Sequence, residues 1–199
     1  TLIWFHAASV GESLSVLALI TRMGIMLPDA QFLITSGTAT SAKLVAQRLP
    51  PRSVHQFAPL DAPGPLKRFL SHWRPDAAIF VESEIWPQML RRTHATGAPM
   101  ALVNARMSDK TVDFWEKWPR TARYLTQNDA MARNMIRMHA PADRVSRGVN
   151  LKSMAGPLPV DDKALARVTA ALDGRPVWVA SSTHEGEERT VLATHRKLL

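Results

Sequence analysis

The chain has 199 residues, a length that fits one large domain or one domain with a piece of another. Because 46% of the residues are hydrophobic and 21% are charged, a packed core is expected and a mainly disordered chain is excluded. The absence of cysteine excludes a disulfide scaffold, a cysteine-ligated metal centre and a thiol nucleophile. The net charge of +8 favours an anionic partner.

Short apolar runs alternate with helical patterns along the sequence. The runs predict strands at 2–6, 31–35, 54–57, 77–81, 100–103, 124–126, 144–146 and 177–180. Helices are expected at 13–26, 39–49, 65–73, 87–96, 112–118, 129–139, 161–172 and 187–199. Runs that are apolar throughout favour a parallel sheet covered on both faces, and the alternation predicts an α/β fold with right-handed crossovers.

A break in this alternation predicts the domain organisation. Gly156, Pro157 and Pro159 continue neither a helix nor a central strand, so we interpret residues 153–160 as a linker. Residues 1–152 would form the first domain. Residues 161–199, with a single strand–helix unit that cannot bury its own core, would begin a second.

The positive charge is concentrated in one window. Residues 117–152 contain eight Lys or Arg and two Asp or Glu, and so carry +6 of the net charge. This pattern is typical of a solvated face, and it also fits a surface that meets phosphates or anionic lipid. No apolar stretch is long enough to span a membrane. Both ends look cut, so we expect any membrane anchor to lie outside this sequence.

Ligands of open parallel sheets bind at the carboxyl ends of the strands, so the loops that follow the predicted strands have most weight. Polar residues gather in five such loops, at 6–12, 35–41, 82–87, 104–106 and 181–188. Because parallel strands all end at the same edge, we expect these polar groups to meet there.

Each loop also has a structural interpretation. Ser9 and Glu12 have the spacing of a capping box, which the residues alone favour slightly over a functional role. Ser36 or Thr38 fits either a helix cap or a phosphate contact at a helix start. Glu82 and Glu84 both follow an apolar strand, and their two negative charges lie close enough to repel each other. A purely structural sequence has little reason to keep both, so this pair favours a functional role.

Several chemistries are excluded by missing motifs. The sequence has no dinucleotide-binding glycine fingerprint, no Walker loop and no Gly-x-Ser-x-Gly elbow. The seven histidines are scattered without a zinc-binding spacing, so no metal site is predicted. His6 and His184 lie in the polar loops, where a further role is open to them.

Six motifs, taken in chain order, resemble those of the 3-deoxy-D-manno-octulosonic acid (Kdo) transferases of Gram-negative lipopolysaccharide synthesis. They are His6-Ala7-Ala8-Ser9-Val10-Gly11-Glu12, Glu82-Ser83-Glu84-Ile85-Trp86-Pro87, Asn104-Ala105-Arg106, Gln127-Asn128, Asn150-Leu151-Lys152 and Ser182-Thr183-His184-Glu185-Gly186-Glu187-Glu188. The resemblance implies the GT-B fold, in which two Rossmann-like domains face a cleft. It also implies that the sequence covers the acceptor domain and only the beginning of the donor domain.

The resemblance further implies a site. Glu12 matches the family's catalytic base, and Glu82 and Lys152 match groups proposed to stabilise the transition state. The residues expected to bind substrate are Ser9, Gly11, Ser36, Thr38, Glu84, Asn104, Arg106, Ser182, Thr183, His184 and Glu187. In two departures, Val149 replaces a usual glycine before Lys152, and the stretch 118–127 is shorter than usual.

The implied partners are the donor CMP-Kdo, a lipid A precursor as acceptor, and an anionic membrane surface on the cytoplasmic face of the inner membrane. No cofactor beyond the donor and no metal is expected, because the leaving group already carries phosphate. Nucleic acid is not expected, since the sequence has no recognisable binding module and only one Tyr for stacking.

The chemistry of these residues agrees with the implied roles. A carboxylate after the first strand accepts the proton of an attacking hydroxyl, a nearby Glu82 would raise the pKa of Glu12, and Lys152 offers positive charge for the phosphate or the sugar carboxylate. Two alternatives stay open: another GT-B enzyme, such as a nucleotide-sugar epimerase, and a non-catalytic basic domain that docks on anionic membrane. We expect the 199 residues alone to be inactive, because most of the donor domain is missing.

Overall fold

The computed structural model describes residues 1–107, 123–154 and 160–198. The chain forms two compact units, Thr1–Gly156 and Pro157–Leu199, and each unit is described by itself. The helix expected at 112–118 lies outside the described residues.

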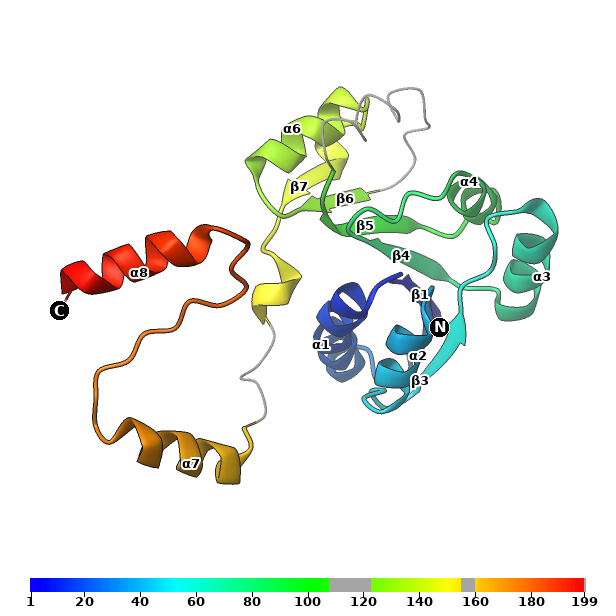
Figure 1. The fold of residues 1–199 in the computed structure, drawn as a ribbon. Coiled ribbons are helices and arrows are strands. Elements are labelled where there is room, and N and C mark those ends of the chain that lie inside the picture. Colours follow the sequence, from blue (N-terminus) through cyan, green and yellow to red (C-terminus); the bar gives the residue numbers. More distant parts are fainter. Residues whose placement is uncertain (108–122, 155–159, 199) are drawn as a thin grey trace. The chain divides into compact units, whose positions relative to one another are not determined.

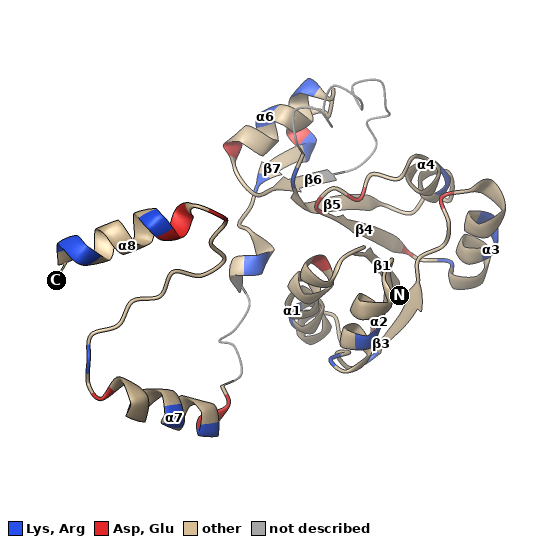
Figure 2. Cartoon of the chain, viewed as in Figure 1, with Lys and Arg blue, Asp and Glu red and all other residues tan. Residues whose placement is uncertain are grey.

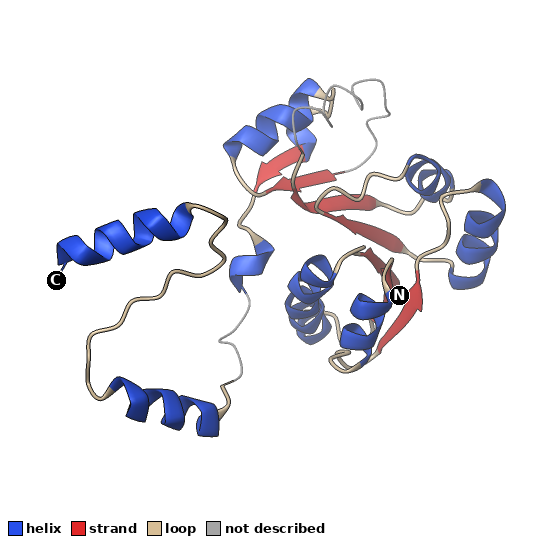
Figure 3. Cartoon of the chain, in the orientation of Figure 1, coloured by secondary structure: helices blue, strands red, loops and turns tan. Residues whose placement is uncertain are grey.

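A sheet of seven parallel strands organises the first unit (Figures 1 and 3). The strands are β1 (Leu2–His6), β2 (Gln31–Ser36), β3 (Ser53–Phe57), β4 (Ala77–Val81), β5 (Met100–Ala105), β6 (Arg123–Thr126) and β7 (Val145–Arg147). Their order across the sheet is β3-β2-β1-β4-β5-β6-β7. This is the Rossmann order with one strand added after β6.

Helices lie between these strands and after the last of them. They are α1 (Val10–Met26), α2 (Ala39–Ala46), α3 (Pro63–Trp73), α4 (Pro87–Ala95), α6 (Asp129–Arg137), and the short 3₁₀ turns η1 (Ala142–Arg144) and η2 (Leu151–Met154). None of the helices among the described residues is both long and apolar enough to cross a bilayer.

The core consists of two layers, one on each face of the sheet, because successive strand residues point to opposite faces. Trp4 and Phe80 pack on one face with the apolar sides of α3, α4 and α6. Phe5 and Ile34 pack on the other face, against α1, α2 and η2. The α/β fold with both faces covered, expected from the apolar runs, is confirmed for the first unit.

The described residues of the second unit form the helices α7 (Asp162–Leu172) and α8 (Glu187–Leu198). The strand expected at 177–180 is wrong: the structure has no strand there, and Val177, Trp178 and Val179 are exposed. A strand requires a neighbour to pair with its backbone. Because the described residues of this unit offer no other strand, the apolar run has no backbone partner.

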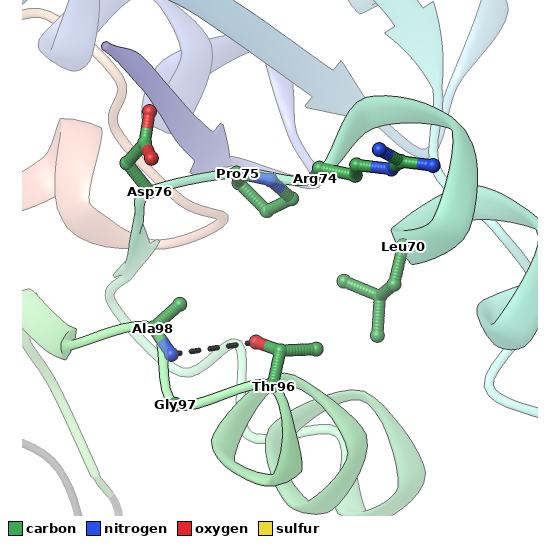
Figure 4. A pocket seen from close by; sticks show the side chains of 7 residues that line it. All are labelled: Leu70, Arg74, Pro75, Asp76, Thr96, Gly97 and Ala98. Carbon is green, nitrogen blue, oxygen red and sulfur yellow. Dashed lines mark hydrogen bonds between the residues drawn. The ribbon is translucent and has the colours of Figure 1, made fainter.

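A hollow of about 420 Å³ opens at the amino edge of the sheet (Figure 4). Its lining comes from the end of α3 and from the turn between α4 and β5, including Arg74, Asp76 and Thr96. These residues directly precede β4 and β5. They therefore lie at the edge opposite to the one where ligands of parallel sheets bind.

Candidate active site

The carboxyl ends of β1 and β4 define the centre of the site. These strands are neighbours in the middle of the sheet, where the strand order reverses, and ligands of open α/β sheets bind at such a point. Glu12 lies in the first turn of α1, directly after β1, and Glu82 follows β4. Two residues 70 positions apart in the sequence thus lie at one edge, as the sequence predicted for parallel strands.

Glu82 and Lys152 form an ion pair at this point. Lys152 Nζ lies 2.6 Å from Glu82 Oε1, and the same carboxylate oxygen accepts a hydrogen bond of 3.2 Å from Asn104 Nδ2. The Glu82 side chain is 9% exposed and that of Lys152 is 43% exposed. The ammonium group is therefore held by a buried carboxylate while part of the lysine faces solvent.

Glu82 and Asn104 both have left-handed backbone conformations, each with φ of 55°. This conformation is uncommon for residues other than glycine, and it is concentrated where function fixes a side chain. The register between β5 and β6 also shifts between Val103 and Ala105, around Asn104. These deviations direct the two side chains toward each other at the ends of neighbouring strands.

Asn104 also fixes the turn that carries Lys152. Its Oδ1 accepts a hydrogen bond of 3.1 Å from the backbone N–H of Leu151, whose side chain is buried against the α1 face of the sheet. A Cβ at Gly11 would lie 3.6 Å from Lys152 Cε, so the lysine passes close to the start of α1. Val149 is exposed, and Lys152 reaches Glu82 with this residue in place of the family's usual glycine.

Glu12 makes the hydrogen bonds of a capping box. Its carboxylate accepts from the Ser9 hydroxyl and from the Ala8 N–H, both at 2.9 Å, and Ser9 caps the Glu12 N–H in return. Burial raises the pKa of Glu12, the two hydrogen bonds oppose that rise, and the negative charges of Glu84 and Glu82 add to it. The sequence analysis expected Glu82 to raise the pKa of Glu12, and the direction agrees. Burial is the largest cause, however, and Glu84 contributes more than Glu82.

Glu84 belongs to a chain of buried side chains. Its Oε2 lies 3.1 Å from His6 Nε2 and also accepts a hydrogen bond from Trp86 Nε1. Burial raises the pKa of Glu84, but the hydrogen bonds from His6 and Trp86 outweigh it, so that the pKa lies below its ordinary value. Glu84 is thus held as a carboxylate beside Glu12.

The other substrate-binding residues expected in the first unit differ in their burial and in their contacts. Thr38 caps α2 by accepting from Ser41 N–H, as its structural interpretation predicted. Ser36 is buried, with its hydroxyl 2.9 Å from His55 Nε2. Arg106 has an exposed side chain, and its backbone joins the loop after β4 through the Glu82 carbonyl and the Ser83 hydroxyl.

The four residues expected in the second unit lie just before or at the start of α8. Thr183 donates to Glu188, and the His184 N–H donates to the carboxylate of Glu187. Ser182 has a left-handed backbone conformation, with φ of 58°. These contacts organise the start of α8, and the structure does not relate them to the first unit.

Sequence reasoning missed Trp4, and it placed Thr35 in the polar loop 35–41 without giving it a role of its own. Thr35 lies near the end of β2, buried, and its hydroxyl contacts both His6 Nδ1 and Trp4 Nε1. A hydroxyl that follows the apolar run Phe32–Ile34 was the available signal. Within the described ranges, no group of three or more His, Asp or Glu residues is placed to hold a metal ion.

Comparison with solved structures gives the class of fold. UDP-GlcNAc 2-epimerase from Neisseria meningitidis, bound to UDP-GlcNAc, has a TM-score of 0.57 over 88% of this chain and 51% of its own, at 11% identity. Anabaena Alr3699/HepE in complex with UDP also gives 0.57, over 87% of this chain and 50% of its own, at 10% identity. At such low identity the likeness shows the fold alone, which is α/β of the GT-B type.

Sequence comparison gives the family. A sequence model described as 3-deoxy-D-manno-octulosonic-acid transferase (kdotransferase) matches residues 1–155. The chain therefore belongs to the Kdo transferase family, a family of glycosyltransferases.

Curated relatives extend over nearly all of the chain. The 3-deoxy-D-manno-octulosonic acid transferase of Rickettsia felis is 37% identical over all of the chain and 44% of its own length. The probable mitochondrial one of Arabidopsis thaliana is 33% identical over all of the chain and 47% of its own length. That of Haemophilus influenzae is 27% identical over 99% of the chain and 48% of its own length. The chain spans about half the length of the curated relatives it matches.

Proposed function

We propose that the protein containing this chain transfers Kdo from CMP-Kdo to a lipid A precursor in lipopolysaccharide synthesis, with inversion at the anomeric carbon and with Glu12 as general base. The observation that carries the proposal is a half-buried carboxylate with a raised pKa, Glu12, at the reversal point of the sheet and close to the Glu82–Lys152 ion pair. The family supports Kdo as the transferred sugar, and the contacts of Glu12 and Lys152 support the proposed roles of these residues.

In the proposed step, an acceptor hydroxyl oxygen forms a bond to the anomeric carbon of Kdo. The bond from that carbon to the phosphate oxygen breaks, and CMP leaves with the electron pair. The hydroxyl proton goes to Glu12. Attack on the face opposite CMP inverts the configuration.

Glu12 is suited to this role by its surroundings. Each carboxylate oxygen has one donor, Ser9 or Ala8, and keeps acceptor capacity for a further hydroxyl. Burial and the neighbouring carboxylates make its proton affinity higher than that of an exposed glutamate, which brings a base closer to the working pH. The two hydrogen bonds also fix the direction in which the carboxylate points.

Lys152 is suited to stabilise negative charge on the donor. Its position is fixed by Glu82, while 43% of its side chain stays exposed, so an anionic group can approach the ammonium. A point charge of this kind interacts with phosphate or carboxylate without needing a metal in the step we propose. Glu82 would then orient the lysine and limit its movement during the reaction.

We also propose that the acceptor is taken from an anionic membrane surface at the cytoplasmic face of the inner membrane. The support is the basic window, in which Arg133 and Arg144 are exposed (Figure 2 shows acidic and basic residues along α6). Not all of the window serves this purpose, because Arg147 pairs with Asp129 and Lys152 pairs with Glu82. Lys117 and Arg120 lie outside the described residues.

The donor would be bound mainly by a part of the protein that follows this sequence. The relatives are about twice as long as the chain, and the second unit has too few elements for a nucleotide-binding domain of its own. In this proposal Ser182, Thr183, His184 and Glu187 contact the donor from the start of α8. The epimerase likeness does not favour a second function, because it shows the fold alone.

The test is a transfer assay with the complete protein, CMP-Kdo and a lipid A precursor. Glu12→Gln keeps one oxygen to accept from the Ala8 N–H but cannot accept the proton, so we expect the transfer rate to fall by about 10²–10⁴-fold. The thermal unfolding temperature should stay close to that of the wild type. Transfer near the wild-type rate by Glu12→Gln would contradict the assignment of the base, and a wild-type protein without Kdo transfer would contradict the function.

A further inference from the structure

The site contains three carboxylates, and their partners differ. Glu82 is paired with Lys152, and Glu84 is paired with His6. Glu12 accepts only from a hydroxyl and a backbone N–H, and among the described residues no cation pairs with it. Burial raises the pKa of Glu12, whereas hydrogen bonds from His6 and Trp86 lower that of Glu84. The contacts of Glu84 therefore decide whether a negative charge stays close to Glu12.

A series of hydrogen bonds connects Trp4 in the core to Glu84 in the site. Trp4 Nε1 donates to the Thr35 hydroxyl at 2.8 Å, the hydroxyl lies 3.0 Å from His6 Nδ1, and His6 Nε2 lies 3.1 Å from Glu84 Oε2. The His6 side chain is 3% exposed and that of Glu84 is 12% exposed. The His6 ring also packs near Trp4 and Phe80, with centroid distances of 6.3 Å. The imidazole is therefore held at both ring nitrogens and lies beside two aromatic rings.

These hydrogen bonds let His6 donate to Glu84 whether the imidazole is neutral or cationic. In the neutral ring, the Thr35 hydroxyl donates to Nδ1 and the proton on Nε2 donates to Glu84. In the cationic ring, Nδ1–H donates to Thr35, and the hydroxyl turns to the Phe5 carbonyl at 3.3 Å. Glu84 receives a hydrogen bond from Nε2–H in either case, and a second one from Trp86.

We propose that His6 is a positioning residue for the reaction: through its contact with Glu84 it holds that carboxylate fixed at the strand edge where Glu12 lies, and in this way tunes Glu12 as the base. The inference rests on the proposed role of Glu12 as general base. His6 touches no reacting atom in it. Its effect passes through the negative charge of Glu84.

Other charged groups around Glu84 are accounted for. Glu12 faces it from α1, His6 from β1, and Glu82 from the end of β4, where Lys152 of η2 neutralises much of the Glu82 charge. Asp61 accepts from the N–H groups of Gln88 and Met89 in the first turn of α4, so its charge is occupied there. Glu84 is thus the neighbour whose charge acts most strongly on Glu12.

The experiment measures the titration of Glu12 directly, in the complete protein, by ¹³C NMR of labelled glutamate carboxyl groups, with Glu12→Gln identifying the signal. Glu84→Gln removes the charge and keeps an oxygen acceptor, so the midpoint should move by about half a pH unit or more to lower pH. The acidic limb of the transfer rate against pH should move in the same direction. His6→Phe keeps the ring packing and loses both nitrogens, and should move the midpoint toward that of Glu84→Gln.

The double variant His6→Phe/Glu84→Gln separates the two possible routes. If His6 acts through Glu84, the double variant titrates like Glu84→Gln alone. His6→Gln, which restores an N–H donor, should keep the midpoint close to that of the wild type and serves if His6→Phe fails to fold. His72→Gln, which removes an imidazole from α3, is the matched control and should leave the midpoint unchanged.

Two results would overturn the inference. An unchanged Glu12 midpoint in Glu84→Gln would show that Glu84 does not act on Glu12. An equal effect of His6→Phe with and without Glu84→Gln would show that His6 does not act through Glu84. Because the NMR titration does not depend on transfer, an enzyme with another substrate would still show the predicted midpoints, and the failure of the two proposals can be told apart.

Discussion

The amino and carboxyl edges of the first unit's sheet use similar residue types in different ways. At the amino edge, Asp76 accepts from the Leu2 N–H, 74 positions away in the sequence, and Arg74 donates to the Ser71 carbonyl, so each charged side chain binds a backbone group. At the carboxyl edge, His6 pairs with Glu84 and Lys152 pairs with Glu82, across 78 and 70 positions of the sequence. The amino edge has the hollow of Figure 4, yet the converging charges lie at the other edge. The candidate site is therefore placed by converging charged groups and not by a hollow.

The comparison is tested most severely by Asn104, which joins Glu82 to the turn that carries Lys152. Asn104→Ala leaves the Leu151 N–H buried without its acceptor and places alanine in a left-handed conformation, so we expect a loss of about 2–4 kcal/mol of unfolding free energy. Urea unfolding measures this. Thr96→Ala, in the amino-edge turn, is the control and should cost well under half as much. Equal losses at the two edges would contradict the comparison.

Lys152→Met should have the next largest effect. The substitution leaves the Glu82 carboxylate, 9% exposed, without its cation, but the exposed part of the lysine limits the loss to about 1–2 kcal/mol. Adding Glu82→Gln should recover part of that stability, whereas Kdo transfer should stay low in both variants. If Glu82→Gln recovers no stability in this background, the ion pair does not stabilise the fold.

At the amino edge, Asp76→Ala removes the acceptor of the Leu2 N–H. We expect a loss of about 1 kcal/mol of stability, with a wild-type rate of Kdo transfer in the complete protein. Thermal unfolding and the transfer assay measure the two effects. A strong loss of transfer at unchanged stability would place function at the amino edge.

The smallest effect is expected outside the site, for the exposed bases of the charged window. Replacing Arg133 and Arg144 with Gln should weaken binding to vesicles that contain anionic lipid by at most about 1 kcal/mol per arginine. Binding to neutral vesicles should not change. An unchanged affinity for anionic vesicles would identify the window as a solvated face.

Much of the first unit follows from local sequence. The apolar runs predicted all seven strands with errors of at most two residues at their ends, and the inner strands were the clearest because buried parallel strands are apolar on both faces. That parallel arrangement also predicted that Glu12 and Glu82 share an edge. The sequence could not predict the left-handed conformations of Glu82 and Asn104, or the chain from Trp4 to Glu84, since both depend on tertiary neighbours.

In the second unit the sequence predicted the helices correctly and the strand wrongly. Its helices were predicted from their periodicity, and the structure adds that the side chain of Asp161 caps α7. The strand at 177–180 was predicted from composition alone, and composition does not provide the neighbour that a strand needs. The position of Lys152 came only from the resemblance, because nothing local indicates that it meets Glu82.

The most direct test of the central claim is the transfer rate of the complete protein, measured as kcat/KM against pH, for the wild type and Glu12→Gln. Because the pKa of Glu12 is raised, the wild-type rate should fall as the pH decreases through a value above the ordinary carboxylate range. The residual rate of Glu12→Gln should be far lower and should lack this limb. A Glu12→Gln variant that keeps both the rate and the acidic limb would contradict the assignment of Glu12 as the base.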